Sequence, residues 1–156
     1  MRLKTRQLLR LHDIWGWHRK GNSMSAEYKS LAAAVVRTAA EDLQEVYKKV
    51  RHWEELDKKG KLKEYVEKEV ERQAGRVAKN YERIKMTLDD KTAVDFFKDD
   101  SKIGDMFCSI IDIDIDGLPR EVVRQRDFVR ENASQLEAKI RAFRSWAQRK
   151  IKEEAI

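Results

Sequence analysis

The chain has few of the residues that break helices or cross-link a fold. Its 156 residues include one proline, six glycines and one cysteine, Cys108. A single cysteine excludes a disulfide framework within the chain and is typical of a protein from a reducing compartment. So little turn chemistry, together with many Glu, Lys, Arg, Ala and Leu residues, favours long helices over a sheet.

Long apolar runs are also missing. No stretch approaches the ~20 apolar residues that a membrane-spanning helix needs. The basic N-terminal segment lacks the apolar core and the cleavage site of a secretion signal. We therefore expect a cytoplasmic protein with no membrane partner. Hydrophobic residues make up 41% of the chain, which is enough for the core of one domain spanning residues 1–156.

The net charge of +6 is spread unevenly over a sequence in which 40% of residues are charged. Residues 1–24 hold six basic residues and one acidic residue, whereas residues 92–118 hold two and seven. Residues 119–156 hold ten basic and six acidic residues. Basic ends suit a polyanion such as nucleic acid, but they could equally neutralise the acidic segment within the fold.

The spacing of apolar residues predicts a long helix hairpin within residues 25–91. One helix is expected over 27–58 and a second from 62 to about 87, each with an apolar residue every third or fourth position. Gly60 fits the left-handed residue that often follows a helix. The narrow stripes predict an antiparallel, coiled-coil-like seam. That seam closes either within the hairpin or across two copies of the chain, and the sequence leaves a homodimer open.

The remaining segments predict shorter helices around the hairpin. A basic helix is expected over residues 3–19. Thr92 is expected to cap a short helix that carries Phe96 and Phe97, and a dense apolar segment follows over 103–111. Pro119 is well placed as the first residue of a final helix that runs nearly to the end. The predicted fold is all-α, an elongated helical bundle of four to six helices.

The stretch "DIDIDG" resembles half of a calcium-binding loop. Asp112, Asp114 and Asp116 with Gly117 fit the first half of the pattern, but position 12 is Val123, which cannot close the cage. These aspartates are weak metal candidates. The simpler interpretation is a connector between helices, with Asp116 capping the last one. We expect no cofactor.

The residues needed for catalysis are not grouped in the sequence. His12, His18 and His52 show no ligand spacing, and no histidine neighbours Cys108. The chain has no glycine-rich phosphate loop, no HExxH, no CxxC pair and no Glu-x-x-His motif. We therefore predict that the protein is not an enzyme and has no small-molecule substrate.

Two stretches, "LAAAVVRTAAEDLQEVYKK" (31–49) and "DFFKDDSKIGDMFCSIIDIDIDGLPREVVRQ" (95–125), resemble small phage and prophage proteins of unassigned function. Members of that group have an alanine-rich helix, a paired-phenylalanine segment and an aspartate-glycine turn before an apolar-basic helix. The matching residues here are Phe96, Phe97, Asp116, Gly117, Val122 and Val123. The resemblance implies a phage-encoded accessory protein in the host bacterial cytoplasm, and it carries no catalytic residues.

Two functions are compatible with these features. The first is binding of nucleic acid or a nucleoprotein through the basic ends, as a regulator or as an inhibitor of a host defence nuclease. In "WGWHRKG" (15–21), Trp17 either stacks on bases or belongs to a solvated helix end. The candidate contacts are Arg2, Lys4, Arg6, Arg10, Trp17, Arg19, Lys20, Arg120, Arg124, Arg126, Arg130, Arg141, Arg144, Arg149 and Lys150.

The second function is a protein–protein interaction or oligomerisation module that does not bind nucleic acid. Its hairpin would dock on a partner helix. The aromatic residues that would make this contact are Tyr47, Trp53, Tyr65 and Tyr81. The competing interpretation is that these side chains pack inside the monomer.

Overall fold

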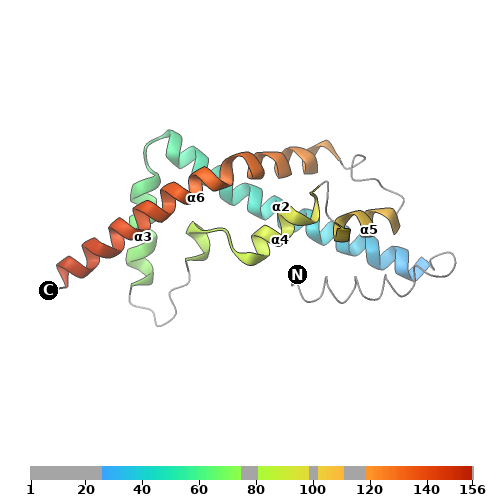
Figure 1. Cartoon of the computed structure of the whole chain (residues 1–156), viewed down its shortest axis with the longest axis horizontal. Helices are drawn as coiled ribbons and strands as arrows, with labels where there is room; N and C mark the ends of the chain where they lie inside the picture. The colour runs from blue at the N-terminus through green and yellow to red at the C-terminus, as the bar shows by residue number, and fades with distance from the viewer. Residues whose placement is uncertain (1–25, 75–80, 99–101, 111–118, 156) are drawn as a thin grey trace. The chain divides into compact units, whose positions relative to one another are not determined.

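The structure is a computed structural model that describes residues 26–74, 81–98, 102–110 and 119–155. In chain order the elements are α2 (Ala26–Lys58), α3 (Leu62–Gln73), the 3₁₀ helix η1 (Glu82–Ile84), α4 (Leu88–Phe96), α5 (Lys102–Ile110) and α6 (Arg120–Glu154) (Figure 1). The described residues contain five α-helices and no strand. The predicted all-α fold class and helix number are therefore confirmed. The helix expected over residues 3–19 lies outside the described residues.

The described residues form two compact units. Unit 1 takes its residues from Met1–Val46 and Leu88–Asp127, and unit 2 from Tyr47–Thr87 and Phe128–Ile156. Helices α2 and α6 each contribute to both units, so each unit combines stretches that are distant in sequence. In the part of the chain that the structure describes, no helix is both long and apolar enough to cross a membrane.

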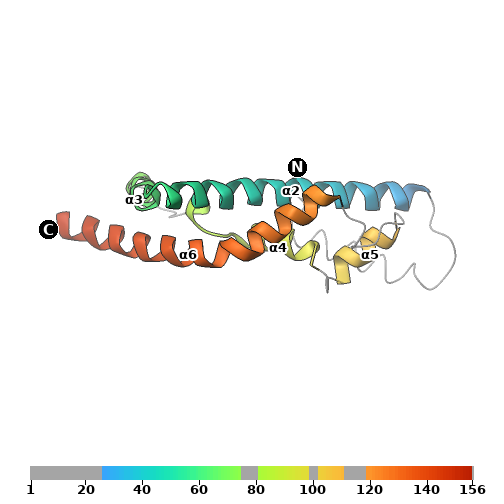
Figure 2. The same ribbon diagram turned by 90° about the horizontal axis from the view of Figure 1, so that it is seen from above.

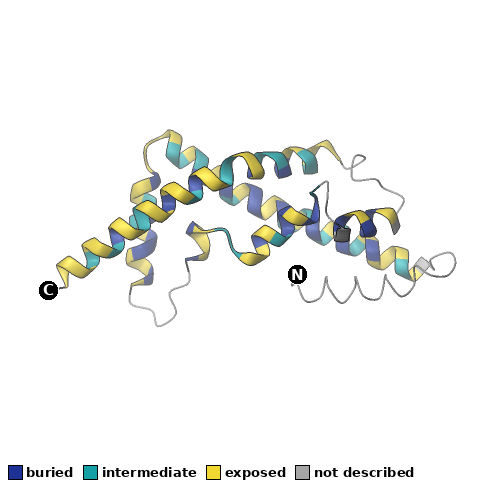
Figure 3. Ribbon diagram, in the orientation of Figure 1, coloured by how far each residue is buried: buried dark blue, intermediate teal, exposed yellow. Residues whose placement is uncertain are grey.

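One side of α2 is buried along most of its length (Figure 3). The buried residues recur every three or four positions, as the sequence predicts for an amphipathic helix. They are Ala32, Val35, Ala39, Leu43, Val46, Val50 and Trp53. Leu31 also fits the apolar spacing, four residues before Val35, but it is 43% exposed, and the neighbouring Ala32 is buried in its place.

In unit 1, aromatic side chains join α4 to α5. The ring of Phe96 lies 5.0 Å from that of Phe97 and stacks on Phe107 at 6.2 Å, measured between centroids. With Thr92 as its cap, this helix would begin at Ala93, but α4 begins five residues earlier, at Leu88. Thr92 therefore lies inside the helix, where its hydroxyl donates to the carbonyl of Leu88 at 2.9 Å. The prediction that Thr92 caps this helix was wrong.

Arg126 fixes the end of α4 to α6 within unit 1. Its Nη1 donates to the carbonyl of Phe97 at 2.8 Å, and its Nε donates to Asp127 Oδ1 at 3.1 Å. Arg126 is buried, with 8% of its surface exposed. Its guanidinium satisfies a carbonyl just after the last residue of α4, where no further helical turn supplies a donor.

In unit 2, the last part of α2 runs beside α6 in the same direction (Figure 2). The rings of Tyr47 and Phe128 meet edge to face at 5.2 Å. Further along both helices, Lys139 Nζ lies 2.7 Å from Asp57 Oδ2. From the first contact to the second, the residue number increases in both helices, from 47 to 57 in α2 and from 128 to 139 in α6. The two helices are therefore parallel here. The long partner of α2 in this unit is α6, and not a continuous helix from 62 to 87.

That expected second helix is shorter than predicted. Helix α3 ends at Gln73, and Glu82–Ile84 form one turn of 3₁₀ helix. Tertiary partners take the backbone groups that a longer helix would use. Trp53 Nε1 donates to the carbonyl of Arg83 at 3.0 Å, and Glu137 Oε1 accepts from the backbone N–H of Met86 at 3.0 Å.

Helix α6 begins one residue later than predicted. The carbonyl of Pro119 accepts from the N–H groups of Val122 and Val123, at 3.0 and 3.2 Å. Pro119 thus precedes the first helical residue, Arg120, and the helix continues without interruption to Glu154.

The turn between α2 and α3 closes with a left-handed glycine, as predicted. Gly60 has φ +69°. Its N–H donates to the carbonyl of Asp57 at 3.1 Å, and the N–H of Lys61 donates to the carbonyl of Leu56 at 2.8 Å. These two bonds are those of the Schellman motif, which satisfies the last carbonyls of a helix.

We predict that Gly60→Ala lowers the free energy of unfolding by about 1 kcal/mol. A Cβ at this position meets no atom within 4 Å, so the cost is the backbone conformation alone. Chemical denaturation measures it. Gly60→Asn should cost less than Gly60→Ala, because asparagine tolerates the left-handed region better. A more stable Gly60→Ala variant would contradict the assigned turn.

We also predict that Arg126→Met lowers the free energy of unfolding by about 2 kcal/mol, because the Phe97 carbonyl loses a charged donor in a buried site. The matched control is Arg130→Met on the exposed side of α6, which should change stability by no more than about 0.5 kcal/mol. Thermal and denaturant unfolding measure both variants. Equal losses of stability in Arg126→Met and Arg130→Met would show that Arg126 does not hold α4.

Candidate nucleic-acid interface

The fold separates the charges of the two units. Among the described residues, unit 1 contains eight Lys and Arg against ten Asp and Glu, a net charge of −2. The described part of unit 2 contains eighteen against twelve, a net charge of +6. Residues 47–87 and 128–156 are each basic, and the fold combines them in one unit. Unit 2 is therefore the part of the described structure suited to a polyanion.

Lysines are concentrated at the turn that Gly60 closes. The segment Lys58–Lys61 and the start of α3 contain the lysines of "KKGKLK" (58–63), and all four lysine side chains are exposed. Lys58 pairs with Glu54 at 2.6 Å. Lys59, Lys61 and Lys63 make no ion pair with any residue that the structure describes. These three ammonium groups are accordingly available to an external anion.

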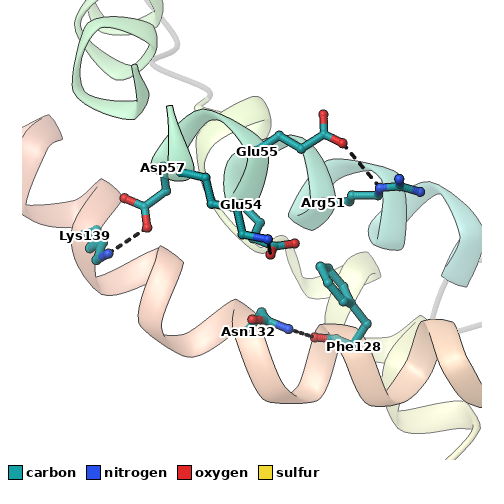
Figure 4. Close-up of polar contacts among 8 residues, drawn as sticks. Arg51, Glu54, Glu55, Asp57, Phe128, Asn132 and Lys139 are labelled. Atoms are coloured by element: carbon teal, nitrogen blue, oxygen red, sulfur yellow. Dashed lines mark hydrogen bonds and ion pairs between the residues drawn. The ribbon is translucent and has the colours of Figure 1, made fainter. Parts of the chain in front are cut away.

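Helix α6 passes this turn and adds further cations. The ion pair of Lys139 with Asp57 lies just before the turn in sequence (Figure 4). Just after the turn, Lys63 Nζ lies 4.0 Å from the ring centroid of Trp146. These two contacts place the turn beside residues 139–146 of α6. We call Lys58, Lys59, Lys61, Lys63, Lys139, Trp146 and Lys150 the lysine–tryptophan cluster.

Trp146 is the exposed aromatic side chain of this cluster. It has 36% of its surface exposed, and Lys150 Nζ lies 5.3 Å from its ring centroid, within cation–π range. The other Phe, Tyr and Trp residues that the structure describes are buried or half-buried. A surface that combines an accessible indole with lysines has both components of a nucleic-acid contact, a stacking face and phosphate ligands.

The predicted binding residues divide into several groups. Arg2, Lys4, Arg6, Arg10, Trp17, Arg19 and Lys20 lie outside the described residues, as do the metal candidates Asp112, Asp114 and Asp116. No group of three or more His, Cys, Asp or Glu residues that could hold a metal ion occurs in the part that is described. Lys150 belongs to the cluster in unit 2. The exposed residues that are not in the cluster are Arg120, Arg124, Arg130, Arg141 and Arg149.

Three of the predicted arginines are occupied within the protein. Arg126 is buried against the Phe97 carbonyl, so it is not accessible to phosphate. Arg124 Nη2 pairs with Glu121 at 2.6 Å. The Arg144 guanidinium lies 5.4 Å from the ring centroid of Tyr81, beside a pocket of about 220 Å³ whose lining includes Tyr81 and Gln148.

The aromatic residues of the alternative function lie mostly inside the protein. Trp53, Tyr47 and Tyr81 are buried, and Tyr65 is half-buried with its ring 5.2 Å from that of His52. A docking surface built on these side chains is therefore not present on the described surface. Trp146, which sequence reasoning did not select, is the exposed one.

Sequence reasoning also missed the lysines of the turn. The run "KKGKLK" was visible, but the predicted contacts were all taken from the two basic ends of the chain. Nothing in the linear sequence places Trp146 beside Lys63, because that proximity depends on α6 packing in unit 2.

A buried carboxylate, Glu69, bonds to two other side chains of α3, the helix that carries Lys63. Glu69 is 5% exposed and accepts from Arg72 Nε at 3.3 Å and from Gln73 Nε2 at 3.5 Å. The hydrogen bonds from Arg72 hold the pKa of Glu69 below its ordinary value, against the opposing effect of burial. Glu69 therefore stays ionised within α3 at neutral pH.

Together, fold and surface define an all-helical protein with a basic surface that presents a tryptophan. Comparison of the chain with protein-family models, curated proteins and solved structures finds no match.

We predict that Glu69→Gln destabilises the protein by about 1–2 kcal/mol at pH 7. The pKa of Glu69 is lowered in the folded state, so its contribution is complete above the unfolded-state pKa and is lost as the pH falls through the folded-state pKa. The difference between wild type and variant should shrink on acidification from pH 6 to about pH 3, as followed by denaturant unfolding. Exposed Glu71→Gln on the same helix is the control, and a difference independent of pH would contradict the prediction.

Proposed function

We propose that this chain is a non-catalytic accessory protein that binds nucleic acid, or a nucleoprotein through its nucleic acid, by the lysine–tryptophan cluster of unit 2. The observation that carries the proposal is the arrangement of Lys59, Lys61 and Lys63 beside Trp146 in the unit with a described net charge of +6. Lysine side chains contact phosphate as mobile point charges and impose no base sequence.

The charge of the cluster is not cancelled by its acidic neighbours. Asp57 pairs with Lys139 and Glu54 pairs with Lys58. The lysines Lys59, Lys61, Lys63 and Lys150 have no such partner among the described residues. Exposed ion pairs contribute little, so phosphate can also compete for Lys58 and Lys139.

The biological setting follows from the resemblance to phage and prophage proteins. In that setting the protein acts in the bacterial cytoplasm, as a regulator of transcription or as an inhibitor that occupies the nucleic-acid substrate of a host defence nuclease. The positive charge of unit 2 favours contact with the nucleic acid itself, since a direct occupant of a nuclease channel would more often be acidic.

We predict that the variant Lys59→Gln, Lys61→Gln, Lys63→Gln binds a labelled 15-nucleotide DNA at least tenfold more weakly than wild type at 50 mM salt. Removing three phosphate contacts should also reduce the slope of log K against log salt by about 2 for a single strand. Fluorescence anisotropy between 50 and 200 mM salt measures both quantities.

The matched control is Lys29→Gln, Arg37→Gln, Lys91→Gln, which removes the same charge from exposed positions of unit 1. This control should keep wild-type affinity within about threefold, because its residues are not part of the cluster and salt screens charges that do not contact the nucleic acid. Equal losses in the two triple variants would assign binding to net charge and not to the cluster. Absence of wild-type binding to DNA and RNA at 50 mM salt would reject the proposed function and favour the protein–protein module.

A further inference from the structure

The position of Trp146 on α6 is unusual for so large an apolar side chain. The next residue, Ala147, is buried, and Leu136 and Ile140 line the same buried side of the helix. Trp146 is turned away from this side and keeps 36% of its surface exposed. Its neighbours across the ring are lysines from two helices, Lys63 of α3 and Lys150 of α6. Two mobile ammonium groups therefore lie within cation–π distance of an indole that remains partly exposed.

From this arrangement we infer that the cluster prefers single-stranded nucleic acid, with one unpaired base stacking on the indole of Trp146 while Lys63 and Lys150 move to the adjacent phosphates. The inference rests on the proposed function. It adds the form of the nucleic acid and the residue that selects it.

The sizes of the competing interactions favour the exchange. Each of the two cations over this indole contributes about two- to fivefold in an equilibrium constant. Stacking of one base on an aromatic side chain contributes roughly 5- to 150-fold in affinity. The displaced ammonium groups are not left without a partner, because a stacked nucleotide brings its own phosphates within reach of flexible lysine side chains. The base thus takes the place of the lysines on the indole. The lysines lose a weak cation–π contact and gain ion pairs with phosphate.

A duplex cannot use this indole in the same way. Both faces of each base in a duplex are covered by neighbouring base pairs, so only the phosphates remain for the lysines. Unpaired bases, by contrast, expose their faces for stacking on aromatic side chains. The lysines of the turn would thus attract either form, and Trp146 would strengthen binding of the single strand alone.

The test compares oligonucleotides that differ in bases but not in phosphate number. The probes are fifteen-residue oligothymidylate, an abasic strand of the same length and a fifteen-base-pair duplex, at 50 mM salt. Wild type should bind oligothymidylate about 5- to 150-fold more tightly than the abasic strand. Trp146→Leu should bind both strands alike, while its affinity for the duplex should stay within twofold of wild type.

Trp146→Phe is the conservative variant. It should retain most of the preference for bases, since it keeps an aromatic face at the same position. It also keeps the test valid if the leucine variant does not fold, as judged by circular dichroism. Oligothymidylate should quench more tryptophan fluorescence in wild type than in Trp146→Phe. The reason is that the bound base stacks on Trp146 in wild type, and the variant lacks this fluorophore.

The outcomes separate the inference from the proposed function. Equal wild-type affinity for the abasic strand and oligothymidylate would overturn stacking and leave phosphate binding intact. Equal losses for strand and duplex in Trp146→Leu would show that Trp146 only supports the lysines, and would also overturn the inference. No binding to any of the three probes would reject the proposed function itself.

Discussion

The burial of one side of α2 is the constraint on which the rest of the structure depends. In unit 1, α2 contributes Val35 and Ala39, which line a small hollow together with Ala93 and Phe96 of α4. In unit 2 the same side continues through Val50 to Trp53, whose indole N–H is bonded to the Arg83 carbonyl. Each unit therefore forms around a different part of a single apolar stripe, and loss of that stripe would remove the support of both.

Much of this framework could be read from the sequence, because local signals determine it. The spacing of the α2 stripe, the left-handed Gly60 and the start of the last helix near Pro119 all follow from side-chain type and position. The end of α3 could not be read in this way. Tyr81 and Ile84 continue the helical spacing of the preceding stripe and are buried, but the Arg83 carbonyl between them bonds to Trp53. A tertiary hydrogen bond determines the structure there, and local spacing does not reveal it.

The candidate site was less predictable than the fold for a related reason. Charge was visible segment by segment, but its grouping depends on which stretches share a unit. The boundary between the units passes through two uninterrupted helices, where composition does not change. Arg126 shows the opposite error, since its charge predicted a phosphate contact and its burial gives it a structural role at Phe97. A list of basic residues therefore does not amount to a binding surface until their partners within the protein are known.

The construction of unit 2 from two separated stretches has a consequence for the protein during its synthesis. The lysines of the turn are made about eighty residues before Trp146, a delay of several seconds at ordinary translation rates of about 5–20 residues per second. Throughout that interval α3 lacks the helix against which Lys63 rests. The nascent chain thus carries exposed cations before it carries the tryptophan that would give them a preference, and any selectivity appears only when α6 has joined unit 2.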